Sequence, residues 1–313
     1  MTESTTSPTT SAPAGSPLIV LAGATGALGL LIAHHLRRRG AEVRALVRPA
    51  SLSGAEAESL RRQGVQVVAA DYGSLADLTR ACQDATCVVS ALNGLRDIIV
   101  EAQGQLLDAA VAAGVPRFIP SDFSADFTRV PEGSNRNFDL RREFARRLDA
   151  APIQATSVLN GMFMDLLRGT APVVLAGPRL VLYWGNADQP LDLTTMQDTA
   201  DFTAAAALDP TTPRYLRVAG EVASPRQLRE AASAATGRPY RLLRPGGLGL
   251  LSTLISITKT MVPAPDDVFP PWQGMQYLRN MLSGDAKLQE PLDNDRYPGL
   301  EWTTVRDLLA AKQ

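Results

Sequence analysis

The sequence predicts an α/β fold, in which a doubly wound parallel sheet is followed by a second, less regular region. Three observations lead to this prediction. An apolar run over 18–22 ends in glycines that stand three residues apart, at Gly23, Gly26 and Gly29. Strand-like and helix-like patterns then alternate five times. Beyond about residue 165 the alternation weakens, so we expect the sheet domain over 17–164 and the second domain over 165–313.

The glycine turn is the first candidate binding element. A strand, a glycine turn and a helix N-terminus together bind pyrophosphate, because the glycines let the backbone approach and the free amides and helix dipole favour negative charge. The spacing here is G-x-x-G-x-x-G, whereas the usual dinucleotide pattern is G-x-G-x-x-G. An ordinary tight turn would also fit this spacing. The strand–helix alternation that follows favours the nucleotide-binding interpretation, since it requires a parallel sheet.

The other elements of the sheet domain follow from hydrophobic periodicity. Helices are expected where apolar residues recur every three or four positions, over 27–39, 54–63, 74–82, 97–112 and 137–149. Short apolar runs between them predict strands over 43–47, 65–69, 85–91, 115–120 and 153–159. Right-handed crossovers between these strands would cover both faces of the sheet.

The second domain has shorter and less regular elements. Strands are expected over 173–175, 180–184 and 215–218, and a helix over 197–208. Another helix should begin after a capping Ser224, with Pro225 in its first position, and end at Gly237. Residues 245–290 are interpreted as helices and loops that cover a crevice with an apolar substrate pocket. Their aromatic residues and methionines are also typical of a plain core.

Arg48 indicates which dinucleotide binds. It ends the second expected strand, about 20 residues past the glycine turn, where NAD-specific sites carry Asp or Glu for the ribose 2′-hydroxyl. A guanidinium matches a 2′-phosphate in charge and geometry, and Ser51 is nearby. The sequence therefore favours NADP(H). The alternative is an arginine that is only solvated at a strand end.

Two further strand ends carry candidate cofactor contacts. Asp71 follows the third strand and could accept a hydrogen bond from the adenine amino group, or could instead cap the helix over 74–82. Ala91, Leu92 and Asn93 follow the fourth strand. Because the carboxyl ends of parallel strands line the ligand crevice, we expect these three residues beside the nicotinamide ribose.

Composition excludes several classes of protein. The net charge is −1 and 45% of residues are hydrophobic, so the sequence has no electrostatic footprint for nucleic acid. The apolar run over 248–257 is too short to span a bilayer. Residues 1–16 are rich in Thr, Ser and Pro and lack the features of a secretory signal, which predicts a disordered tail and a cytoplasmic protein.

No metal site is expected. The two cysteines, Cys82 and Cys87, have no metal-binding or disulfide pattern and fit a reducing compartment. The only histidines, His34 and His35, fall within the helix expected over 27–39, where structural or solvated roles are favoured over catalysis.

Five blocks of sequence resemble one known family. They are GATGALG at 23–29, VRALVR at 43–48, VVSAL at 88–92, LLDAAVAAGV at 106–115 and RFIPSDF at 117–123. Over about residues 17–240 the chain is similar to the NmrA-like, isoflavone reductase-like group of atypical short-chain dehydrogenases/reductases. The resemblance implies an NADP-binding Rossmann domain, a smaller substrate domain and, for the reductases of the group, hydride transfer from nicotinamide C4.

The resemblance also implies roles for individual residues. Pyrophosphate binding falls to the glycine turn and the helix that follows it, at Gly23, Thr25, Gly26, Leu28 and Gly29. Arg48 would bind the 2′-phosphate. The residues that would border the nicotinamide are Ala91, Leu92, Asn93, Phe123, Asn160 and Phe163.

The chain departs from the family in its candidate catalytic residues. The plant reductases carry a lysine in the helix after the fifth strand, and Arg141 stands at what we take to be its position. Arginine can stabilise an oxyanion but does not readily exchange a proton near neutral pH. The Tyr–Lys pair of common short-chain dehydrogenases is absent as well, since lysine occurs only at Lys259, Lys287 and Lys312.

We therefore expect an NADPH-dependent reductase that acts on a small, largely apolar or aromatic carbonyl, enone or benzylic ether. Arg141 would stabilise developing negative charge, and Asp122, Asp139 or a water would deliver the proton. The main alternative is a non-catalytic NADP-sensing regulator that acts through a protein partner. An enzyme that uses the nucleotide for epimerisation or dehydration is a weaker third interpretation. A homodimer is one option for the assembly.

Overall fold

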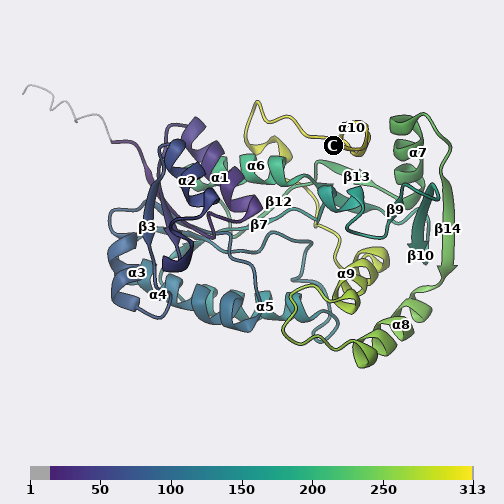
Figure 1. Ribbon diagram of the computed structural model, residues 1–313, viewed down its shortest axis with the longest axis horizontal. Helices are drawn as coiled ribbons and strands as arrows, with labels where there is room; N and C mark the ends of the chain where they lie inside the picture. Colours follow the sequence, from purple (N-terminus) through teal and green to yellow (C-terminus); the bar gives the residue numbers. More distant parts are fainter. Residues whose placement is uncertain (1–14, 312–313) are drawn as a thin grey trace, which may run out of the picture.

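A computed structural model describes residues 15–311, and the tail expected over 1–16 falls almost entirely outside them (Figure 1). The central sheet has six parallel strands in the order β3-β2-β1-β4-β5-β6. These are β1 (Leu18–Ala22), β2 (Glu42–Val47), β3 (Gln66–Ala69), β4 (Cys87–Ser90), β5 (Arg117–Ile119) and β6 (Gln154–Ala155). The order reverses between β1 and β4, which confirms the doubly wound sheet and creates a crevice at that point.

Helices cover both faces of the sheet (Figure 1). The ones from the first half of the chain are α1 (Ala27–Arg38), α2 (Ala55–Arg62), α3 (Leu75–Cys82), α4 (Gln103–Ala112) and α5 (Arg136–Asp149). Side chains alternate along β1, so Ile19 and Leu21 pack in one core with Ile32 of α1, while Val20 packs in another with Leu106 of α4. Both cores lie against β1, which accounts for its uninterrupted apolar sequence.

The first core is completed from the second half of the chain. Helix α6 (Met196–Leu208) lies beside α1 in Figure 1, and Phe202 joins the core that contains Ile19. His35 of α1 is buried at this contact, where its Nδ1 pairs with Asp201 at 2.5 Å and its Nε2 lies 2.6 Å from the Gln197 amide nitrogen. Burial lowers the pKa of His35 below its usual value, against the opposing effect of the Asp201 charge, so burial disfavours the protonated ring.

The strand expected over 153–159 is divided at Thr156. Its first part, β6, pairs with β5, while its second part, β7 (Ser157–Leu159), pairs with β12 (Tyr215–Arg217). Thr156 donates its amide to Phe118 O at 3.0 Å, and Ser157 donates to Arg214 O at 2.8 Å. The chain therefore changes partner between these two residues.

The helix expected over 97–112 also begins differently. Its first part is a π-helix, η2 (Asp97–Ala102), and α4 continues from it. A short 3₁₀ turn, η1 (Pro49–Ser51), follows β2.

The remaining elements form two small sheets and a set of helices. One sheet contains β8 (Met162–Phe163), β11 (Leu191–Thr194) and β13 (Glu221–Ala223), and the other contains β9 (Val174–Leu175), β10 (Leu180–Trp184) and β14 (Arg241–Gly246). The helices are η3 (Met164–Arg168), α7 (Pro225–Thr236), α8 (Leu248–Met261), α9 (Pro271–Ser283), η4 (Asn294–Arg296) and α10 (Val305–Ala310). Ser224 and Gln227 form the capping box of α7, and Gly237 ends it with a φ of 66°, as expected.

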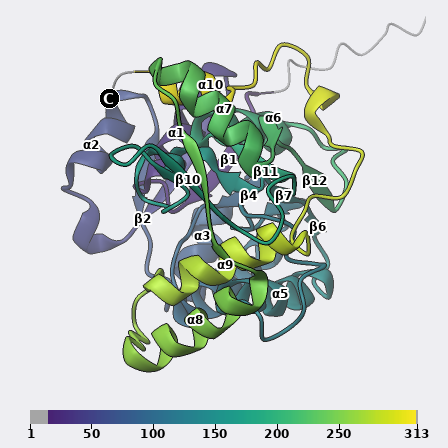
Figure 2. The ribbon, with the colours of Figure 1, turned by 90° about the vertical axis from the view of Figure 1, so that its right-hand side faces the viewer.

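Helices α8 and α9 pack side by side (Figures 1 and 2). Within residues 15–311 no helix has the length and apolar character needed to cross a membrane.

Candidate functional site

The glycine turn packs too closely on its surroundings to hold a side chain at two of its three glycines. Gly23 has a φ of +73°, and a Cβ there would lie 2.5 Å from Ala91 O. A Cβ on Gly29 would collide with the Gly23 carbonyl. Gly26 donates its amide to Gly23 O at 3.0 Å and is the N-cap of α1. Only glycine fits at positions 23 and 29, so the turn packs directly on the strand-end loop that begins at Ala91.

The N-terminus of α1 fits an anionic ligand. Gly26 provides no side-chain cap, and no acidic residue lies in the first turn of the helix. The amide groups of that turn, which includes Leu28, therefore lack a side-chain acceptor. Thr25 lies within the glycine turn, between Gly23 and Gly26, and Leu28 is half-buried in the first turn of α1. The chain thus presents uncapped amides and a positive dipole end where the sequence predicts the pyrophosphate.

Arg48 and Ser51 lie at the end of β2. Arg48 is exposed, and its carbonyl accepts the Ser51 amide at 2.8 Å, which brings both residues into one turn.

Asp71 is exposed after β3, where its carboxylate accepts from Gly73 N at 2.9 Å. Ser74 accepts from Asp77 N at 3.3 Å and is the N-cap of α3. The capping role considered for Asp71 was therefore wrong, because the serine three residues later performs it.

Three strand-end loops meet at the crevice. In the loop after β4, Ala91 donates its amide to Ala22 O at 2.9 Å. In the loop after β5, Ser121 Oγ donates to Leu92 O at 2.5 Å. In the loop after β7, Asn160 donates its amide to Ser124 O at 3.0 Å. Among the other predicted contacts, Phe123 is buried, Phe163 is half-buried and Asn93 is exposed.

Asn160 is fully buried with an unsatisfied side chain. Its carbonyl accepts from Thr194 Oγ1 at 2.7 Å, so its backbone is held at both polar groups. Its Oδ1 and Nδ2 atoms have no hydrogen-bond partner within residues 15–311. A buried amide without partners is costly. Asn160 therefore offers an NH₂ donor group and a carbonyl acceptor to a ligand or a water.

Asp122 is a buried carboxyl group at the end of β5. Its Oδ2 accepts from Ser157 Oγ at 2.7 Å, and Ser157 Oγ in turn accepts from Arg214 at 2.6 Å. Its Oδ1 is buried and lacks a partner in the described part of the chain. Burial raises the pKa of Asp122, against the opposing effects of the Ser157 hydrogen bond and the nearby Arg141 and Arg214 charges. This environment favours a neutral carboxylic acid more than that of an exposed aspartate does.

Arg141 and Asp139 lie on α5 but have different surroundings. Arg141 is buried, and its guanidinium donates to Asn137 O at 3.2 Å, one turn back on the same helix. Its Nε is buried with no acceptor among the described residues. Asp139 accepts from Gly133 N at 3.1 Å and from Arg142 at 2.7 Å. Residues two positions apart on a helix do not face the same side. The structure thus brings the charge of Arg141, and not that of Asp139, close enough to act on Asp122.

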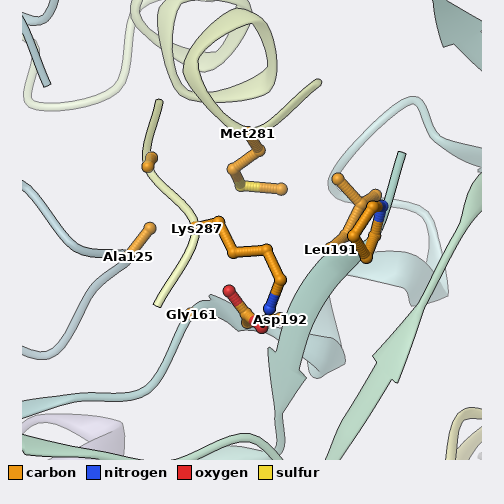
Figure 3. Close-up of a pocket in the computed structure, with 8 residues that line it drawn as sticks. Ala125, Gly161, Leu191, Asp192, Met281 and Lys287 are labelled. Atoms are coloured by element: carbon orange, nitrogen blue, oxygen red, sulfur yellow. Dashed lines mark hydrogen bonds and ion pairs between the residues drawn. The ribbon is translucent and has the colours of Figure 1, made fainter. Parts of the chain in front are cut away.

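A second feature lies beside the loop after β7 (Figure 3). A cavity of about 10 Å³ is lined by Ala125, Gly161, Pro190, Leu191, Asp192, Met281, Ala286 and Lys287. Lys287 Nζ lies 2.9 Å from Asp192 Oδ1, and Leu288 N donates to Asp192 Oδ2 at 2.7 Å. The cavity is the size of one water molecule. This ion pair holds the segment after α9 against β11, whose backbone at Asp192 packs on Gly161.

Some residues at the crevice were given no role from the sequence. Ser121, which follows β5, and Ser157, which begins β7, bond to the predicted site, and a position at a strand end is a signal that could have assigned them. Gln103 is fully buried and bonds to Ser121, although its place in a long helical pattern gave no such signal. No cluster of residues suited to a metal ion is found over the described range 15–311.

Known proteins resemble this chain over most of its length. Phenylcoumaran benzylic ether reductase from Ginkgo biloba is 26% identical, covering 94% of this chain and 98% of that protein. Bifunctional pinoresinol-lariciresinol reductase from Linum album is 27% identical, covering 96% and 95% respectively.

Solved structures share the fold. AtPrR2 with NADP⁺ and (+)pinoresinol has a TM-score of 0.79 at 22% identity and covers 94% of this chain and 98% of its own. Isoflavone reductase has a TM-score of 0.80 at 21% identity, with the same coverage. The model of the NmrA-like family matches residues 16–259, which is more than half of the chain. The chain therefore belongs to the NmrA-like family.

Proposed function

We propose that this protein is an NADPH-dependent reductase of a small, largely apolar or aromatic carbonyl, enone or benzylic ether. The observation that carries the proposal is that the glycine turn packs on the strand-end loop at Ala91, which is hydrogen-bonded through Leu92 to the loop that contains Asp122, a buried carboxyl group whose Oδ1 has no partner among residues 15–311. The reductases among the relatives support the reaction class. The bound cofactor would supply the hydride, and the protein would supply binding, orientation and a proton.

Cofactor binding is assigned to residues at the carboxyl edge of the sheet. The uncapped amides after Gly26 would bind the pyrophosphate. Arg48 is exposed and free to bind the 2′-phosphate, with Ser51 beside it, and the exposed Asp71 could accept from the adenine amino group. The nicotinamide would be bordered by the loop 91–93, by Phe123, and by the pair Asn160 and Phe163. The free donor and acceptor of Asn160 suit an amide such as the nicotinamide carboxamide.

The proton and the charge stabilisation are assigned to Asp122 and Arg141. A buried carboxyl group with a raised pKa keeps its proton to higher pH than an exposed one, so Asp122 can act as a general acid. Arg141 would stabilise negative charge on the substrate oxygen through its unpartnered Nε. Asp139 is not assigned a catalytic role, because its carboxylate is engaged by Gly133 and Arg142.

The arginine at position 141 also keeps a second candidate function in view, that of an NADP-sensing regulator. The two functions differ in turnover. The reductase should consume NADPH when it is given some member of a panel of aromatic ketones, enones and benzylic ethers. The consumption is measured as loss of absorbance at the nicotinamide band of NADPH. Tight NADPH binding with no turnover across that panel, together with a copurifying protein partner, would instead support the regulator.

A further inference from the structure

We propose that Gln103 is a positioning residue that sets the spacing between the two strand-end loops, 91–93 and 121–123, that border the nicotinamide end of the cofactor. The inference rests on the proposed function, because that function places the nicotinamide between these loops. Gln103 is fully buried in the first turn of α4. It was not among the residues predicted from the sequence, and its side chain forms no hydrogen bond with the glycine turn or with Arg48 in the contacts of residues 15–311.

Gln103 stabilises the π-helix η2 at the point where it continues into α4. The backbone N–H of Gln103 donates to Ile98 O, five residues back, where an α-helix would use Ile99 O. The Ile99 carbonyl is instead satisfied by the Gln103 side chain, whose Nε2 donates to it at 3.0 Å. The π-helix also packs on the loop after β4, since a Cβ on Gly94 would lie 2.5 Å from Ile98 Cβ. The side-chain amide of Gln103 thus repairs the helix at the point where the loop 91–93 leads into it.

Gln103 also links the π-helix to the loop after β5. Gln103 Oε1 accepts the Ser121 amide at 2.9 Å. Ser121 Oγ then donates to Leu92 O at 2.5 Å, and Leu92 lies in the loop after β4. The hydrogen bonds form a closed circuit from the π-helix through Gln103 and Ser121 to Leu92. Asp122 is the next residue in the chain, so this circuit also holds the backbone directly before it.

The circuit needs a group that donates and accepts at once and has the length of a glutamine. A leucine would leave the Ile99 carbonyl and the Ser121 amide without partners in a buried place, which is costly. π-helical turns are rare and often lie at functional sites. One turn of this kind, stabilised by a single buried amide and joined to two crevice loops, is better explained by loop positioning than by helix stability.

The test compares two ligands that share only one end of the cofactor site. NADPH needs both the phosphate-binding residues and the loops, whereas 2′,5′-ADP needs only the phosphate-binding end. We expect Gln103→Leu to weaken NADPH binding about tenfold, which corresponds to about 1.4 kcal/mol. Its affinity for 2′,5′-ADP should stay within about twofold of that of the wild type. Gln105→Leu, at a half-buried position on the same helix, is the matched control and should leave both affinities unchanged.

Gln103→Glu provides the signature that a general loss of stability would not produce. When the introduced carboxyl group is deprotonated, it can accept from the Ser121 amide but repels the Ile99 carbonyl; when it is protonated, it restores both hydrogen bonds. NADPH binding by this variant, relative to the wild type at the same pH, should recover as the pH is lowered from about 8 to about 6, because burial raises a carboxyl pKa toward this range.

Three results would overturn the inference: wild-type NADPH affinity in Gln103→Leu, an equal loss for both ligands, or a Gln103→Glu defect that does not change with pH. Failure of the proposed function looks different, since the wild-type protein would then bind NADPH but consume none of it with any substrate of the panel. The affinity comparison for Gln103 can still be made in that case, because it measures binding alone. Both affinities can be measured by isothermal titration calorimetry on the full chain.

Discussion

Replacement of Gly23 by alanine tests the reasoning about the glycine turn. Two costs add at this position. A φ of +73° lies in the left-handed region, where a non-glycine residue costs about 1–2 kcal/mol. The new Cβ would also meet Ala91 O at 2.5 Å and Leu92 N at 2.9 Å, both of them backbone atoms that cannot rotate away. Such overpacking costs about 1–3 kcal/mol. We expect Gly23→Ala to lower the free energy of unfolding by about 2–5 kcal/mol in total.

Gly40 offers a matched control, because it has a φ of +79° but no heavy atom within 4 Å of an added Cβ. Gly40→Ala should therefore lose only the conformational part, about 1–2 kcal/mol. Urea unfolding followed by circular dichroism gives both values. If the two variants unfold at the same urea concentration, the close approach between the glycine turn and the loop at Ala91 is not a real constraint, and the argument for this turn fails.

Three further predictions concern the cofactor, the proton and the helix interface. Arg48→Glu should weaken NADPH binding at least about tenfold more than NADH binding, because only NADPH carries the 2′-phosphate; equal losses in titrations with the two cofactors would remove Arg48 from that role. Asp122→Asn should lower kcat at least about 100-fold while the Kd for NADPH stays unchanged, and a variant that kept its turnover would show that another group delivers the proton. For His35, burial lowers the pKa below 6.5, so the unfolded chain binds a proton more readily than the folded one. The stability advantage of the wild type over His35→Gln, measured by urea unfolding, should therefore shrink as the pH falls below 6.5, and a constant difference would contradict the assignment.

Sequence patterns that depend on neighbouring residues predicted the structure well. The glycine turn, the order of strands and helices before residue 120 and the Ser224 cap are encoded in local spacing, and the structure has them at the expected places. The family resemblance pointed to Asn160, and the search for a proton donor pointed to Asp122; both are buried with polar atoms that have no partner among residues 15–311.

Features set by residues far apart in the chain could not be predicted in this way. The π-helix at 97–102 keeps an apolar periodicity close to that of an α-helix, and it is stabilised by a side chain that also bonds to Ser121. The division of the strand at Thr156 depends on residues 214–217, which pair with its second half. Arg141 was a candidate by position alone, and its electrostatic effect on Asp122 became visible only in three dimensions.

The position of α6 has a consequence for the way the protein is made. Phe202 closes the core around Ile19, and β12 supplies the only pairing partner of β7 among the described residues. A nascent chain that has emerged only as far as residue 164 therefore carries an apolar sheet face with incomplete cover and a strand with no neighbour. Such surfaces are prone to aggregate. The nucleotide-binding half must wait for residues 196–217 to leave the ribosome before its fold is complete, so its folding is coupled to the synthesis of the second half.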